Sequence, residues 1–183
     1  IPIASSARGV LAPETVAAVM DEETAGIMVT NPNTLGLFEE NIKAVAKIVH
    51  DKGGLVYGDD ANMNAVMGLV NMSEIGIDVL HLNLHKTFAT PHGGGGPGAG
   101  PVCVRQHLEP FLPVPRVRMS GGAYELSEDH PLSIGKLQAF WGNMGNLIRA
   151  YSYILSLGAE NLKRASELAV LNANYIKERL KGT

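Results

Sequence analysis

Apolar and polar residues follow two different periods along the first hundred positions, and the changes of period predict strands separated by helices. Short, mainly apolar runs predict buried strands, whereas apolar residues repeated every three to four positions predict helices. The predicted strands cover residues 25–30, 55–57, 77–82 and 100–104. The predicted helices cover residues 13–20, 39–50 and 62–69. Strands that alternate with helices indicate right-handed crossovers and a mostly parallel sheet, so the predicted fold class is α/β.

The second half of the chain has a different pattern. Residues 111–130 are rich in proline and glycine, and we interpret them as a loop or a hairpin. Residues 134–157 and 159–181 have helical periodicity, with a predicted break near Gly158. The second of these helices carries a broad apolar stripe from Leu162 to Leu180, which predicts either core packing or a subunit interface.

Composition and charge narrow the class of protein. A chain of 183 residues with 45% hydrophobic and 18% charged residues is typical of a soluble globular protein. The net charge of −3 and the scattered basic residues give no reason to expect nucleic-acid binding. No apolar run approaches the ~20 residues of a membrane span, and the first residues do not form a signal peptide. Cys103 is the only cysteine, so we expect a reducing compartment, the cytoplasm.

Three reactive residues lie at or just past predicted carboxyl ends of strands. These residues are Thr30, Asp59 and Lys86. In parallel sheets, ligands bind beyond the carboxyl ends of the strands. Their shared position therefore predicts a site at this edge of the sheet.

Lys86 stands within His81-Leu-Asn-Leu-His-Lys-Thr-Phe88, shortly before the glycine run Gly93–Gly96. A partly desolvated lysine amine loses its proton more readily and can then form an imine with an aldehyde. Together with Asp59, which could hold a pyridinium nitrogen, this lysine is the protein half of pyridoxal phosphate chemistry. His85 can donate to a phosphate, and the backbone N–H groups of a glycine-rich loop can approach a ligand closely.

The histidines and aspartates near Lys86 have alternative roles. His81, His85 and His92 could be partial metal ligands, but their spacing matches no known ligand pattern, and one cysteine supplies no thiolate set, so we predict no metal site. Asp59 could instead cap the helix predicted from residue 62. Asp60 competes with Asp59 for the cofactor, but neighbouring side chains on a strand point to opposite faces, so only one can face a ring.

The motifs resemble those of glycine decarboxylase, the P-protein of the glycine cleavage system. The resemblance covers nearly the whole chain, through residues 28–41, 57–65, 81–101, 111–115, 133–136 and 171–174. In bacteria with a split enzyme, the cofactor lysine lies in the second subunit, which this chain most resembles. The chain lacks an initiator methionine, and we expect it to be a fragment of that subunit or of the corresponding C-terminal half.

The resemblance implies the aspartate-aminotransferase-like fold, known as fold type I of pyridoxal-phosphate-dependent enzymes. Residues 1–130 would be part of the large α/β domain that binds the cofactor, and residues 131–183 a helical segment leading toward the small C-terminal domain. The family's phosphate-cradling loop and ring-stacking aromatic residue would precede residue 1. We therefore expect this piece to be inactive by itself.

The resemblance also implies roles for individual residues. Lys86 would be the catalytic lysine that binds the cofactor, and Asp59 the partner of the pyridinium nitrogen. Ala61 would pack against one face of the ring, His85 would reach the phosphate, and Thr30 would lie near the 3′ oxygen. At position 60 the family usually has glycine, so Asp60 departs from the pattern; if that glycine serves a positive-φ backbone, aspartate tolerates it better than most residues.

The implied reaction is glycine decarboxylation, followed by transfer of the aminomethyl group to the lipoyl arm of the H-protein. Partners would be the H-protein and, in a split enzyme, the first P-protein subunit. Two alternatives stay open at this point. The chain could belong to another fold type I decarboxylase or aminotransferase, or it could be a non-catalytic fragment of the fold.

Overall fold

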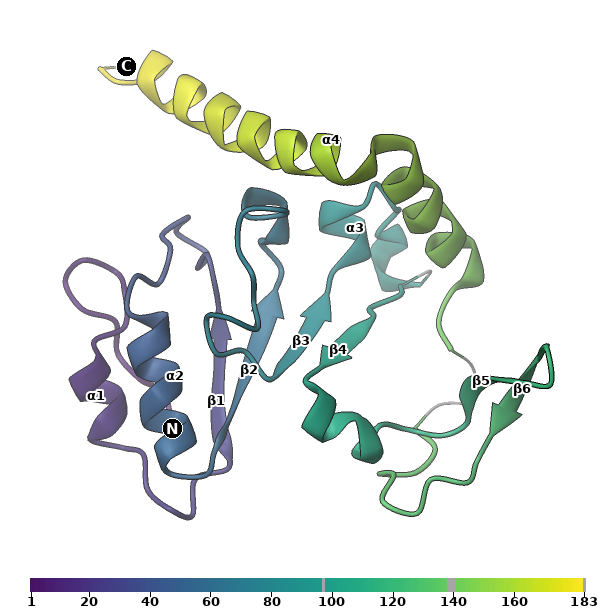
Figure 1. The fold of residues 1–183 in the computed structure, drawn as a ribbon. Helices are drawn as coiled ribbons and strands as arrows, with labels where there is room; N and C mark the ends of the chain where they lie inside the picture. The colour runs from purple at the N-terminus through teal and green to yellow at the C-terminus, as the bar shows by residue number, and fades with distance from the viewer. Residues whose placement is uncertain (97, 138–140, 183) are drawn as a thin grey trace.

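The computed structural model describes residues 1–96, 98–137 and 141–182, which form a four-stranded sheet, a separate hairpin and a long C-terminal helix (Figure 1). The sheet has the spatial order β1 (Gly26–Thr30), β2 (Leu55–Asp60), β3 (Val79–Leu82) and β4 (Val102–Val104). Strands β1, β2 and β3 are parallel, and β4 is antiparallel to β3. The predicted mostly parallel sheet is therefore confirmed, with one antiparallel edge strand.

The remaining elements connect and cover these strands. The helices are α1 (Pro13–Ala17), α2 (Ile42–Asp51), α3 (Leu84–Thr87) and α4 (Met144–Arg179). Three 3₁₀ turns are η1 (Met63–Ala65), η2 (Gly93–Gly95) and η3 (Gln106–Phe111). The proline- and glycine-rich stretch contains a hairpin of β5 (Arg116–Ser120) and β6 (Ala123–Ser127), which is one of the two predicted forms.

The core lies between the sheet and the two N-terminal helices (Figure 1). Along β2, alternate side chains are buried, and Val56 points to the same face as Val29 of β1. Helix α2 presents Val45 and Val49 to this face, and α1 adds Val16. Period-two burial on the strands and helical spacing on α2 therefore meet in one apolar layer.

The prediction of a helix over residues 62–69 is wrong, because only the 3₁₀ turn η1 forms there. The Asn62 side chain donates to the backbone oxygens of Pro32 (2.8 Å) and Asn33 (3.2 Å), so it ties this segment to the loop after β1. Gly68 then has φ of +72°, which ends any right-handed helix. Long-range contacts of the backbone and of Asn62 override the local helical pattern.

The predicted start of the first C-terminal helix, at residue 134, is also wrong. Helix α4 begins at Met144, where the Asn143 side chain accepts from the backbone N–H of Asn146 (3.1 Å). The backbone of Ile134 instead donates to Phe111, and that of Gly135 accepts from Val114. Residues 138–140 of the predicted helix lie outside the described residues.

The predicted break at Gly158 is confirmed, since this residue has φ of 65° and ψ of 174° within α4. The apolar stripe that follows is divided between two environments. Leu162 and Ala165 pack against a second core cluster, whereas Leu171 and Leu180 are 62% and 60% exposed. Within the described part of the chain, neither α4 nor any other helix is long and apolar enough to cross a membrane.

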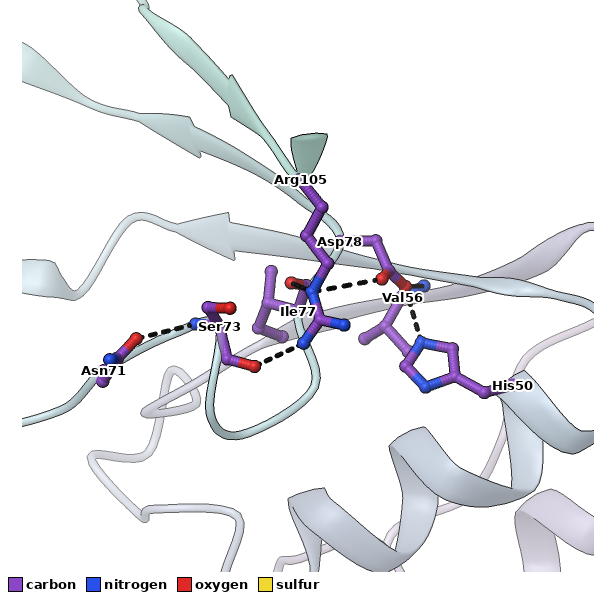
Figure 2. Close-up of polar contacts among 7 residues, drawn as sticks. All are labelled: His50, Val56, Asn71, Ser73, Ile77, Asp78 and Arg105. Atoms are coloured by element: carbon purple, nitrogen blue, oxygen red, sulfur yellow. Dashed lines mark hydrogen bonds and ion pairs between the residues drawn. The ribbon is translucent and has the colours of Figure 1, made fainter. Parts of the chain in front are cut away.

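A buried polar cluster joins the amino-terminal ends of the strands, opposite to the edge where β2 and β3 end (Figure 2). Asp78 is 3% exposed and immediately precedes β3. Its Oδ2 atom accepts from the backbone N–H of Val56 (2.8 Å) and contacts His50 Nε2 (2.7 Å). Its Oδ1 atom lies 3.5 Å from Arg105 Nε, which donates to the Ile77 oxygen (3.1 Å). One carboxylate thus links α2, β2, β3 and the segment after β4.

Replacing Asp78 by alanine is expected to lower the free energy of unfolding by about 3 kcal/mol, because the Val56 N–H and Arg105 would lose a buried partner. Urea denaturation of the two proteins measures this loss. The matched control is Asp51→Ala, which removes an exposed pair with Lys47 and should cost at most about 0.5 kcal/mol. Equal losses in the two variants would show that the buried cluster contributes no more than a surface ion pair.

Candidate active site

The sheet register brings Thr30 and Asp59, two of the predicted site residues, to one edge. Thr30 lies opposite Asp59 on the neighbouring strand, and Asp59 lies opposite His81 of β3. All three strands run in the same direction, so their carboxyl ends meet there (Figure 1). Ala61 directly follows β2 at the same edge.

Thr30, Asp59 and His81 occupy the face of the sheet that is opposite to α1 and α2. On this face, Met28 of β1 is 66% exposed and Val102 of β4 is 52% exposed. The 3₁₀ turn η3 borders this face beside Val102, where Leu108 and Phe111 line one pocket with it, and Met28 is left exposed. The predicted site residues of β1 and β2 are therefore open to a ligand from this side.

Asp59 is held by two contacts to one of its oxygens. Its Oδ1 atom accepts from the backbone N–H of Ala61 (3.0 Å) and lies 3.2 Å from His81 Nε2. The other imidazole nitrogen, Nδ1, lies 2.8 Å from the Tyr57 hydroxyl. The Asp59 and His81 side chains are 27% and 24% exposed. Asp59 therefore stabilises the turn after β2, and it does not cap η1, whose N-cap is Asn62.

The contact between His81 and Asp59 was missed by sequence reasoning, which considered His81 only as a partial metal ligand. The two residues are 22 positions apart, and only the register of β2 and β3 places them side by side. From the sequence alone, the spacing of Tyr57 and Asp59, two residues apart on a strand, shows only that these two side chains share a face. No group of three or more His, Cys, Asp or Glu side chains in the described residues could hold a metal ion.

Asp60 points to the opposite, helix-covered face and is 1% exposed. Neither of its carboxylate oxygens has a hydrogen-bond partner among the described residues. Burial, and then the negative charge of Asp59, raise the pKa of the Asp60 carboxyl from 3.8 to about 7. Asp60 is not among the described residues with positive φ, so the backbone here does not require the glycine that the family usually has.

The buried Asp60 carboxyl predicts a pH dependence of stability. Between pH 4 and 7 the unfolded chain loses the Asp60 proton while the folded chain keeps it, so stability falls as pH rises and levels off above about pH 7. Relative to Asp60→Asn, which stays neutral, the wild type should lose about 2–3 kcal/mol between pH 5 and 8. Urea denaturation at each pH measures the difference in free energy of unfolding between the two proteins. The contributions of the other titrating groups are the same in both and cancel in this difference. A constant difference would mean that Asp60 titrates normally.

Lys86 lies on α3, immediately after β3, and its side chain is exposed. The same short helix is anchored by Leu84 and by Phe88 at its end, which pack with Met67 and with Ala150 of α4. The position of the lysine is thus set by the second core cluster. The described residues do not bury its amine, so the partial desolvation expected from the sequence is not present in this part of the chain.

His85 lies next to Lys86 and meets His92 edge-to-face, with ring centroids 4.7 Å apart. Burial lowers the pKa of His85, and the positive charges of His92 and Lys86 lower it further. A neutral imidazole can still donate one hydrogen bond to a phosphate oxygen.

The glycine run after His92 owes its composition to backbone conformation. Gly93, Gly94 and Gly95 all have positive φ, at 58°, 65° and 98°. A Cβ added to Gly94 or Gly95 would meet no described atom within 4 Å. These glycines are therefore required by the turn itself, and not by a close approach to another described part of the chain.

The chain is similar to known proteins in family, sequence and fold. A family model described as aminotransferase class-V matches residues 2–128. "Probable glycine dehydrogenase (decarboxylating) subunit 2" of Caldanaerobacter subterraneus subsp. tengcongensis is 60% identical over 182 residues, which cover 100% of this chain and 38% of that protein. The protein of the same name from Endomicrobium trichonymphae is 53% identical over 181 residues, with 99% and 38% covered. The chain thus spans 38% of the length of these relatives.

Among solved structures, the inhibitor-bound glycine decarboxylase (P-protein) of the glycine cleavage system superposes with a TM-score of 0.63. The match has 20% sequence identity and covers 79% of this chain and 35% of that protein. This likeness concerns the fold, and it confirms the predicted α/β fold of type I.

Proposed function

The chain belongs to the aminotransferase class-V family, and from this premise we propose that it is the lysine-bearing part of a pyridoxal-phosphate-dependent glycine decarboxylase. The observation that carries the proposal is the 60% identity to a subunit 2 of glycine dehydrogenase over 182 residues, an alignment that covers 100% of this chain. The other relative, at 53% identity, has the same name. Since the chain covers 38% of these proteins, the proposal concerns the enzyme of which this chain forms a part.

The residues present fit the cofactor. Asp59 keeps one carboxylate oxygen, Oδ2, free of hydrogen bonds within the described chain, while Oδ1 is held by Ala61 and His81. The Lys86 amine is exposed, and His85, whose lowered pKa favours the neutral imidazole, stands beside it as a hydrogen-bond donor. A carboxylate, a primary amine and an imidazole are the groups that bind a pyridinium nitrogen, an aldehyde and a phosphate.

When bound, pyridoxal phosphate supplies an electron sink for the electrons released as glycine loses carbon dioxide. Lys86 would hold the aldehyde carbon through its Nζ atom, and the same amine could later carry a proton. Asp59 would keep the pyridine nitrogen protonated through a carboxylate oxygen, which stabilises the developing negative charge. Thr30 and Ala61 would line the same edge of the sheet, near the 3′ oxygen and one face of the ring.

The proposed enzyme passes the aminomethyl group to the lipoyl arm of an H-protein. If the enzyme is split, as the name subunit 2 of the relatives implies, its other partner is the first subunit. The open face of the sheet, with Met28 and Val102 exposed, is consistent with a chain that is completed by further polypeptide. We place the enzyme in the cytoplasm, in keeping with the single exposed Cys103.

The test is exchange of labelled bicarbonate into glycine. With pyridoxal phosphate, H-protein and the first subunit present, the full-length protein is expected to show exchange with glycine and none with alanine or serine. Residues 1–183 alone should show none, because Lys86 and the face that carries Asp59 are exposed to water. Activity toward another amino acid and not glycine would replace the proposal by a different fold type I reaction. Exchange by residues 1–183 alone would show that the described residues form a complete site.

A further inference from the structure

We infer that His81 is a positioning residue for Asp59, and that Tyr57 holds the His81 ring in the orientation this role requires. The inference deepens the proposed function and rests on it, since it concerns the carboxylate that would face the cofactor nitrogen. It adds two residues to the site, neither of which touches substrate.

The three side chains form one line across β2 and β3. Tyr57 and Asp59 are two residues apart on β2, so both point to the open face, and His81 lies opposite Asp59 on β3. The imidazole therefore stands between them, with Nδ1 at 2.8 Å from the Tyr57 hydroxyl and Nε2 at 3.2 Å from Asp59 Oδ1. The rings of Tyr57 and His81 are 5.6 Å apart between centroids, which adds a packing contact.

Hydrogen-bond chemistry sets the proton positions in this line. An ionised carboxylate only accepts, so the inferred interaction with Asp59 requires the proton of His81 to be on Nε2, which lies 3.2 Å from Oδ1. In the neutral ring, Nδ1 is then an acceptor. The Tyr57 hydroxyl can donate to this nitrogen, so its contact is compatible with the Nε2–H tautomer and holds the ring in place beside Asp59.

This arrangement has a specific consequence for the carboxylate. Oδ1 of Asp59 accepts from the Ala61 N–H (3.0 Å) and lies 3.2 Å from His81 Nε2, and these two contacts restrain the plane of the group. Oδ2 is then presented in a defined direction. A carboxylate that must keep a ring nitrogen protonated needs such a defined orientation.

A comparison within the molecule separates this role from a structural one. The other histidine–aspartate contact, His50 with Asp78, lies at the opposite ends of the strands, and Asp78 is 3% exposed. There the Val56 N–H and Arg105 engage the same carboxylate, with contacts to both oxygens. Asp59, in contrast, keeps Oδ2 available at the predicted ligand edge. The two contacts have similar chemistry but only one leaves an oxygen for a ligand.

The first test is ¹⁵N NMR of the full-length enzyme labelled at histidine, with His81→Gln used to assign the resonances. Nε2 of His81 is expected to be protonated, and Tyr57→Phe should shift the Nδ1 resonance. This readout needs neither cofactor nor activity. An unprotonated Nε2 would overturn the inference, whatever the enzyme catalyses.

The second test measures bicarbonate exchange and the protonation of ¹⁵N-labelled pyridoxal phosphate in the full-length enzyme. Groups that orient a reacting residue commonly contribute about 10- to 100-fold, so His81→Leu should lower kcat by that factor and change KM for glycine by less than about threefold. His81→Gln, whose amide can donate to Asp59, should recover kcat to within about fivefold. The control His107→Leu replaces an exposed histidine on η3 and should leave kcat unchanged.

The outcomes distinguish the inference from the proposed function. A protonated ring nitrogen and wild-type kcat in His81→Leu would overturn the positioning role and leave the proposed function intact. If His81→Leu does not fold, Tyr57→Phe and His81→Gln decide the matter, because both keep the size of the side chain. A wild type that binds the cofactor without glycine exchange would refute the proposed function, while loss of ring protonation in His81→Leu would still support the positioning role.

Discussion

Replacing Lys86 by arginine is expected to lower bicarbonate exchange in the full-length enzyme by at least roughly 1000-fold, the largest effect that any single substitution in this chain should have. Arginine keeps the positive charge and approximate length of the side chain but stays protonated, so it cannot bind an aldehyde covalently. Lys86 is exposed on α3, hence the substitution should not disturb the core formed by Leu84 and Phe88. Thermal unfolding of the variant should match that of the wild type.

The covalent attachment itself can be located directly. Borohydride reduction of the wild-type enzyme should fix the cofactor to the peptide that contains Lys86, as read by mass spectrometry. The matched control is Lys43→Arg, which changes an exposed lysine on α2 and should leave exchange unaltered. Labelling of Lys43, Lys47 or Lys136 in place of Lys86 would show that the cofactor lysine was assigned wrongly.

Replacing Asp59 by asparagine is expected to lower exchange by about 1000-fold, or about 4 kcal/mol of transition-state stabilisation. Asparagine has the same shape, and its oxygen can still accept from the Ala61 N–H and lie beside His81 Nε2. The variant therefore loses the negative charge while the local contacts remain. Bicarbonate exchange and ¹⁵N NMR of the cofactor ring report the loss of rate and of the ring proton.

The matched control for Asp59 is its neighbour. Asp60→Gly restores the residue usual in the family and removes a carboxyl that is buried on the opposite face without a described partner. Exchange should stay within about threefold of the wild type, because the side chain does not reach the open face. The reverse order of effects, with Asp60→Gly the more damaging, would assign the cofactor contact to Asp60.

The local pattern of apolar and polar residues was sufficient to predict the elements that pack through their own apolar side chains. Helix α2 was predicted over residues 39–50 and is found at Ile42–Asp51, because its apolar spacing matches one buried face. The break at Gly158 was also foreseen, since glycine takes the positive φ found there at little cost. These features depend on residues that are close in the sequence.

Prediction was wrong where distant segments compete for the backbone. Residues 62–69 have helical periodicity, but Asn62 binds the loop after β1. Residues from 134 onward were also expected to be helical, yet the backbone of Ile134 and Gly135 pairs with residues 111–114. Each hydrogen bond of this kind joins positions about 20 to 30 residues apart, which no local period reveals.

For the site, the sequence by itself determined which chemical groups are present and that Asp59 and Asp60 must face opposite ways. The tertiary structure decided which of the two aspartates is open and which is buried, because only packing against α2 distinguishes the faces of β2. It also decided that His81 meets Asp59, since that contact depends on the register of β2 and β3. A shift of that register by one residue would turn His81 away from Asp59, and register is set by the burial of a whole strand and not by the residues of the site.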